Sequence, residues 1–106
     1  MVAFMKRVVK SSEPTSPHIN NAVTLGQFVR ASRTTSGMTI DQAAMCIGVA
    51  KQTLADLENG KPTTSIGIIL RILAGLGLNL FVADKSDTMA LSEFIRQRPI
   101  LTGRKK

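Results

Sequence analysis

Residues 37–61 read GMTIDQAAMCIGVAKQTLADLENGK, and this stretch decides the fold. Thr39 stands before a run of apolar residues at helical spacing and predicts the start of a short helix, because its hydroxyl can accept from an orphan N–H of the first turn. Gly48 predicts the end of that helix. Leu54 and Leu57 follow at the spacing of a buried helix edge. The stretch therefore predicts two short helices joined by a tight turn.

This arrangement has the spacing of a helix-turn-helix, in which the first turn of the second helix enters the DNA major groove. Four side chains of that second helix are left facing outward: Lys51, Gln52, Ala55 and Asp56. Lysine can donate to guanine, glutamine can pair with adenine, and alanine can contact a thymine methyl group. Lys51 could instead bind phosphate only. Asp56 is expected to be a solvated residue unless it accepts from cytosine N4.

Two further helices are predicted around this pair, which makes the chain an all-α, compact four-helix domain. Residues 24–37 form the first, with Thr24 as its cap. Residues 65–77 form a nearly all-apolar fourth helix, with Ser65 as its cap. Such a helix needs cover on most faces, so Ile68 and Ile72 on the face expected to point outward predict a second subunit.

The segment after the fourth helix, Leu78–Val82, is a short β-prone run and predicts a strand. A single strand needs a partner, and pairing with the same segment of a second copy supplies one. The predicted homodimer interface comprises Ile68, Ile72, Leu78, Leu80, Phe81 and Val82.

The two ends of the chain differ in composition from its centre. Residues 1–22 predict a flexible arm, residues 23–84 the folded and dimerising domain, and residues 85–106 a basic tail with an amphipathic segment at 89–96. The chain has 14 Lys plus Arg against 7 Asp plus Glu, and the excess lies in the ends. This charge favours a polyanionic partner, although basic tails can also be merely solvating.

Several function classes are excluded by what the sequence lacks. One cysteine and one histidine cannot build a disulfide framework or a zinc site, and Cys46 is expected to be a small buried hydrophobe. The apolar stretch 66–82 contains Arg71 and is too short to span a membrane. The N-terminal residues show no signal-peptide pattern, so a cytoplasmic protein is predicted. No catalytic set, metal site or cofactor motif is found, so the prediction is a protein that is not an enzyme.

Residues 23–78 resemble the Xre family of phage-repressor-like DNA-binding domains, a lambda-repressor-like fold. The motifs that carry the resemblance are the ENG ending at 58–60, the LG opening at 25–26 and the LGL sequence at 76–78. The basic tails, the strand in place of a fifth helix and the KQT helix start at 51–53 are similar to HipB-type antitoxins.

The resemblance implies roles for individual residues. It places Lys51 and Gln52 at base edges, and it assigns DNA phosphate contacts to Thr39, Thr53, Asn59 and Lys61. It also implies a structural ion pair between Arg33 and Glu58. Ile40 stands where the family commonly has glutamine, and Ala50 stands where it commonly has a serine or threonine cap, so phosphate clamping is expected to be weaker.

The function that the resemblance implies is a dimeric, sequence-specific repressor on a palindromic operator. A HipA-type kinase toxin would be its partner, with autoregulation of a shared operon. The apolar stripe of Leu91, Phe94 and Ile95 is the candidate surface for that toxin. Two alternatives stay open: a solitary Xre regulator without a toxin, and a protein-interaction module that no longer reads DNA.

Overall fold

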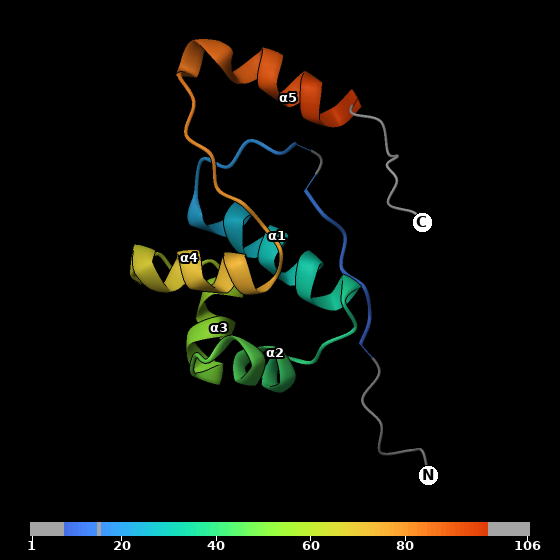
Figure 1. The fold of residues 1–106 in the computed structure, drawn as a ribbon, viewed down its shortest axis with the longest axis vertical. Coiled ribbons are helices and arrows are strands. Elements are labelled where there is room, and N and C mark those ends of the chain that lie inside the picture. Colours follow the sequence, from blue (N-terminus) through green and yellow to red (C-terminus); the bar gives the residue numbers. More distant parts are fainter. Residues whose placement is uncertain (1–7, 15, 98–106) are drawn as a thin grey trace.

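The computed structural model describes residues 8–14 and 16–97, which contain five α-helices and one short 3₁₀-helix (Figure 1). The elements are α1 (Ala22–Thr35), α2 (Ile40–Ile47), α3 (Lys51–Glu58), α4 (Ile66–Gly75), η2 (Lys85–Asp87) and α5 (Thr88–Gln97). In Figure 1, α2 and α3 lie at one end, α5 lies at the other, and α1 and α4 lie between them. The prediction of an all-helical domain with a helix-turn-helix is confirmed.

The hydrophobic core is formed where α1 to α4 meet. Ala43 of α2 and Leu54 and Leu57 of α3 are buried, as their spacing predicted. The fully buried cluster comprises Val29, Ala43, Ala44, Leu54, Leu57, Ile72 and Leu73. Complete burial of one such large aliphatic side chain stabilises the fold by about 1.5 to 3 kcal/mol. This small core fixes α3 against α1 and α2.

Gly26 allows α1 to lie directly on the C-terminal end of α3. A Cβ atom at this position would clash with the carbonyl oxygen of Leu57 and would lie 2.8 Å from that of Glu58. Both neighbours are backbone atoms, which cannot move aside as a flexible side chain can. The LG motif of α1 therefore sets how closely the first helix approaches the third.

The predicted helix caps are partly right. Ser65 caps α4 by accepting a hydrogen bond from the backbone N–H of Ile68 at 3.3 Å. Helix α1, however, begins three residues earlier than the predicted cap at Thr24 implies, and its cap is Asn21, whose Oδ1 accepts from the backbone N–H of Thr24 at 2.8 Å. Asparagine is among the strongest N-cap residues, so the earlier start has a clear cause.

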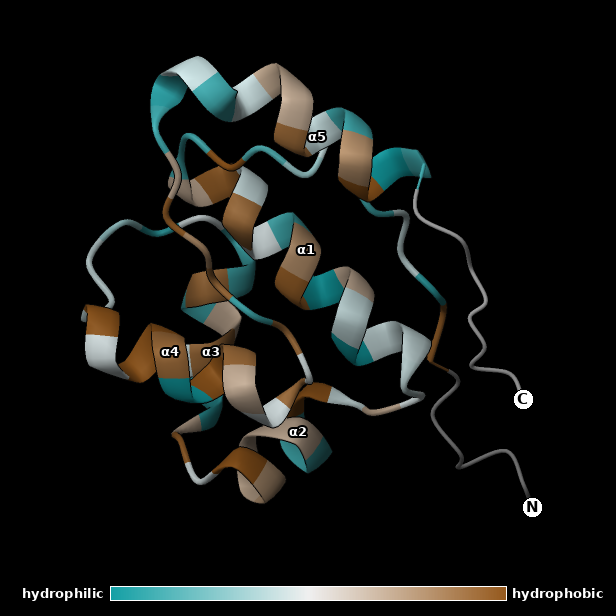
Figure 2. Cartoon of the chain, turned by 45° about the horizontal axis from the view of Figure 1, so that its top comes forward, coloured by the Kyte–Doolittle hydropathy of each residue, from teal (hydrophilic) through white to brown (hydrophobic). Residues whose placement is uncertain are grey.

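The outward face predicted for α4 is wrong. Ile72 is fully buried in the core and Ile68 is partly buried against it, whereas Ile66 and Leu70 are 61% and 45% exposed. Figure 2 shows that α4 is hydrophobic along most of its length. Periodicity cannot decide the orientation of such a helix. Contact with α2 decides it, and Gly75 lies against Ile47 there.

The predicted strand at Leu78–Val82 is also wrong. Within the described residues this segment is neither strand nor helix, and it links α4 to η2. Leu78 packs partly against the core, but Leu80, Phe81 and Val82 are exposed. An isolated segment cannot satisfy its backbone groups by pairing, so β propensity alone does not produce a strand.

No described helix is long and apolar enough to cross a membrane.

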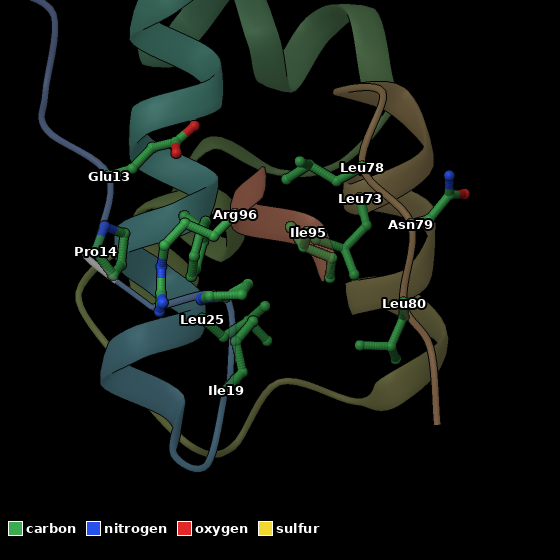
Figure 3. Close-up of a pocket in the computed structure, with 12 residues that line it drawn as sticks. Glu13, Pro14, Ile19, Leu25, Leu73, Leu78, Asn79, Leu80, Ile95 and Arg96 are labelled. Carbon is green, nitrogen blue, oxygen red and sulfur yellow. The ribbon is translucent and has the colours of Figure 1, made fainter. Parts of the chain in front are cut away.

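The described part of the N-terminal end is bonded to α1, and α5 lies across a cavity from the core. Residues 8–14 and 16–21 have no regular structure, but the backbone N–H of Ser11 donates to Thr34 Oγ1 of α1 at 2.9 Å. The amphipathic segment predicted at 89–96 is helical, as part of α5. A cavity of about 420 Å³ separates α5 from the core, with Ile95 facing Leu25 and Leu73 across it (Figure 3). The basic run at 104–106 lies outside the described residues.

Candidate nucleic-acid interface

The start of α2 is held by a reciprocal pair of hydrogen bonds. Thr39 Oγ1 accepts from the backbone N–H of Gln42 at 3.1 Å, and Gln42 Oε1 accepts from the backbone N–H of Thr39 at 2.8 Å. This capping box confirms Thr39 as the N-cap. It also shows that the Gln42 side chain is engaged by the helix start.

The turn between α2 and α3 depends on Gly48. Its φ of +88° lies in the left-handed region, where a residue with a Cβ atom is strained. Arg71 of α4 donates to the carbonyl oxygen of Gly48 at 3.4 Å and so connects α4 with the turn. Ala50 then precedes α3 as its N-cap residue and makes no side-chain cap bond. The first N–H groups of α3 thus lack the side-chain acceptor that a serine or threonine would supply.

Cys46 lies on α2 and is exposed, so the prediction that it is buried is wrong. Met45 beside it is also exposed, while Ala43 and Ala44 supply the buried side of the helix. A helix of only eight residues buries a narrow face, and here two alanines occupy it. A cysteine between two apolar residues carries no sequence signal that distinguishes the two faces.

The predicted base-reading residues lie together along α3, and Lys51 is exposed at its first position. Lys51 Nζ lies 3.2 Å from Asp41 Oδ1 in the first turn of α2. Gln52 Nε2 donates to Asp56 Oδ1 at 2.8 Å, one turn further along the helix. Ala55 is half-buried between these polar residues and the core.

Asp56 differs from the solvated residue that was predicted. Its side chain is only 26% exposed, and its Oδ1 also lies 3.8 Å from Lys61 Nζ. The same oxygen therefore accepts the hydrogen bond from Gln52 and faces the Lys61 ammonium. This arrangement was not predicted from the sequence, although the spacing of four residues between Gln52 and Asp56 is a recognisable signal for a side-chain pair on a helix.

On the inner side of α3, the structure brings Arg33 and Glu58 together. The Glu58 side chain is 1% exposed, and its two oxygens accept from Arg33 Nε at 2.6 Å and Arg33 Nη2 at 2.9 Å. Arg33 Nη1 also donates to the carbonyl oxygen of Met38 at 2.8 Å. One guanidinium thus links α1, the loop before α2 and the end of α3.

Arg30 is a third member of this network, and it was not predicted from the sequence. Arg30 Nε donates to Glu58 Oε1 at 3.3 Å, and Arg30 Nη2 donates to Asn59 Oδ1 at 2.9 Å. The signal was its spacing of three residues from Arg33, which places both on one face of a helix. Asn59, assigned to phosphate, therefore has its side-chain oxygen bonded to α1 in the free chain.

The other predicted site residues lie as follows. Thr39 precedes α2, the half-buried Thr53 lies in the first turn of α3, and Lys61 follows Gly60, whose φ of +83° is typical of a left-handed helix end. At the far end of the molecule, Phe94 of α5 is 69% exposed, Leu91 is exposed and Ile95 is half-buried over the cavity. The interface and the toxin candidates thus lie at opposite ends (Figure 1).

A family model described as a helix-turn-helix domain matches residues 24–80. A curated relative, the uncharacterized HTH-type transcriptional regulator y4mF of Sinorhizobium fredii (strain NBRC 101917 / NGR234), is 36% identical over 62 residues, which cover 58% of this chain and 82% of that protein. The chain belongs to the family of helix-turn-helix transcriptional regulators.

Solved structures of HipB share the fold of this regulator. A HipB–O4 20mer complex and a HipA–HipB–O2–O3 complex each match with a TM-score of 0.59 and 25% identity, over 64% of this chain and 96% of the compared chain. The resemblance to phage-repressor-like domains, and to HipB among them, is confirmed.

Proposed function

We propose that this regulator represses transcription by binding an operator as a homodimer, with α3 in the major groove. The observation that carries the proposal is the exposed start of α3, where Lys51 and Gln52 project from a helix whose inner side is held by Glu58. A recognition helix has to be rigid on one side and accessible on the other to read base edges.

The exposed apolar surface of α4 and the following link supports the homodimer. Ile66 and Leu70 of α4 and Phe81 and Val82 of the link are all exposed in the single chain. Soluble monomers rarely leave large contiguous apolar areas uncovered. We therefore replace the predicted contact at Ile72 by one centred on Ile66 and Leu70. A dimer with two-fold symmetry would place its recognition helices about 34 Å apart, on a palindromic operator.

We further propose that the chain is a cytoplasmic antitoxin of the HipB type, with a HipA-type kinase as its partner. The HipA–HipB–O2–O3 complex among the similar structures supports this proposal. Phe94 on the exposed side of α5, together with Leu91, offers apolar area for a protein partner. Replacing Phe94 by alanine is expected to weaken binding to a HipA-type kinase and to leave DNA binding unchanged.

Fluorescence anisotropy tests the DNA-binding proposal. The duplex upstream of the chain's own reading frame is titrated against a scrambled duplex, with the parent and with Lys51→Ala/Gln52→Ala, at fixed physiological salt. We expect the parent to prefer the upstream duplex by about a thousandfold or more, and the double variant to lose that preference. Equally weak binding to both duplexes would contradict autoregulation.

A protein-interaction module that does not read DNA is the competing function. It is favoured by one observation: Ala50 gives the start of α3 no side-chain cap, and its methyl group cannot donate a hydrogen bond to a phosphate. In that case no duplex would be preferred, while the neighbouring gene product would still bind.

A further inference from the structure

The helix-turn-helix lacks the positive charge that the rest of the chain carries in excess. The whole chain has a formal net charge of +7, but residues 38–61 contain only two basic residues, Lys51 and Lys61, against Asp41, Asp56 and Glu58. Glu58 is neutralised by Arg33 on the inner side. The surface that would face DNA thus presents two lysines and two aspartates.

Each of these lysines lies beside one of these aspartates. Lys51 Nζ is 3.2 Å from Asp41 Oδ1, and Lys61 Nζ is 3.8 Å from Asp56 Oδ1, an oxygen that also accepts from Gln52 at 2.8 Å. In the free chain, the donors predicted to meet DNA at Lys51, Gln52 and Lys61 are therefore directed at carboxylates of the same surface.

We propose that Asp41 and Asp56 are specificity-determining residues, which lower the affinity for DNA of random sequence more than the affinity for the operator. This inference rests on the proposed function. When Lys51 or Lys61 binds a phosphate, it loses its ion pair with the aspartate and gains one with the phosphate. The aspartate carboxylate, now without its lysine, then lies close to the negatively charged DNA. Little net attraction remains, because exposed ion pairs and phosphate contacts are similar in strength.

Contacts with base edges do not carry this penalty. A lysine ammonium has three donors, so Lys51 can donate to guanine O6 or N7 and keep its contact with Asp41. Gln52 has a second amide hydrogen besides the one donated to Asp56, and Asp56 can itself accept from cytosine N4. The two carboxylates therefore oppose phosphate contacts and tolerate, or assist, base contacts.

The test compares Asp41→Asn and Asp56→Asn with the parent and with Asp87→Asn. Asp87 is exposed and directly precedes α5, which lies at the opposite end of the molecule from α2 and α3 (Figure 1), so its variant undergoes the same charge change away from the interface. The probes are a random-sequence duplex and the duplex upstream of the gene, in anisotropy titrations at several salt concentrations. Thermal melts by circular dichroism verify that every variant is folded.

We expect each interface variant to bind the random duplex about five- to tenfold more tightly than Asp87→Asn does, because it releases a lysine and also removes a carboxylate that the phosphates repel. The logarithmic salt slope should steepen by about 0.9 for each additional phosphate that a lysine neutralises. Affinity for the upstream duplex should rise by less than about threefold. In a Lys51→Ala background the effect of Asp41→Asn should become smaller, because no ammonium is then released and only the repulsion between the carboxylate and the phosphates is relieved.

The inference is overturned if Asp41→Asn and Asp56→Asn bind the random duplex no more tightly than Asp87→Asn. It is also overturned if the affinities for both duplexes rise equally. If the parent protein does not prefer the upstream duplex, autoregulation is contradicted instead. The affinities of the variants for the random duplex then test the roles of Asp41 and Asp56 on their own. Failure of the inference and failure of the proposed function are thereby distinguished.

Discussion

Each side of α3 carries a carboxylate that faces basic or amide side chains, but the two carboxylates differ in burial and in role. Glu58 on the inner side is 1% exposed and is bonded by Arg33 and Arg30, whereas Asp56, two residues earlier, is 26% exposed and faces Gln52 and Lys61. A buried carboxylate that loses its partner leaves an uncompensated charge, while an exposed one is solvated by water. The inner pair therefore positions the helix, and the outer pair is the one that would be exchanged in the proposed contact with DNA.

The largest loss of stability is expected when Glu58, on the inner side of α3, is replaced. Glu58→Ala leaves the mostly buried Arg33 guanidinium without its carboxylate and should lower the free energy of unfolding by about 3 to 5 kcal/mol. Urea denaturation followed by circular dichroism measures this. Asp56→Ala is the matched control and should lose less than about 1 kcal/mol. Equal losses would contradict the difference between the two sides.

The next largest effect is expected at Gly26, where α1 lies on the same inner side. Gly26→Ala adds a methyl group against the carbonyl oxygens of Leu57 and Glu58 and should destabilise the fold by about 2 to 3 kcal/mol. Gly67→Ala on α4, where no atom lies near the added methyl, is the control and should leave stability unchanged or raise it. A neutral result at Gly26 would mean that the two helices can move apart.

A smaller loss of stability is expected at Thr39, the N-cap residue of α2 that is also a predicted phosphate contact. Thr39→Ala removes half of the capping box and should cost about 1 kcal/mol, whereas Thr39→Ser should cost much less. Thermal denaturation compares the two variants. If serine does not retain the stability, the hydroxyl is not what caps α2.

The smallest effect on stability is expected at the outer side itself. Lys51→Ala removes a single exposed ion pair with Asp41 and should change the free energy of unfolding by less than about 0.5 kcal/mol. Its effect should instead appear in operator affinity, measured by anisotropy. A marked loss of stability would show that Lys51 positions the helix and does not serve only for recognition.

The sequence predicted the parts of the fold that depend on local pattern. Two short helices, a glycine turn, the caps at Thr39 and Ser65 and the burial of Leu54 and Leu57 are all confirmed. Spacing and capping chemistry act within a few residues, so they can be read directly. The exposure of Lys51 and Gln52 follows from the same local pattern, whereas Ala55 and Asp56 are half-buried.

The features that were not predicted, or were predicted wrongly, depend on contacts between distant parts of the chain. The orientation of α4, and with it the burial of Ile72, depends on where α2 lies. The segment Leu78–Val82 has β propensity but no neighbouring strand within the described residues. Arg30 joins Glu58 and Asn59, which are far from it in sequence, and the partner of Asp41 lies in the next helix. Such contacts follow only from the assembled fold.

The most direct test of the account maps where DNA contacts the regulator. Backbone amide chemical shifts of the isotope-labelled protein are compared with and without the upstream duplex. We expect the largest changes at Thr39 and at residues 51–56, with small changes in α5. Changes concentrated in α5 and the link before it, with 51–56 unaffected, would contradict the claim that the outer side of α3 reads DNA.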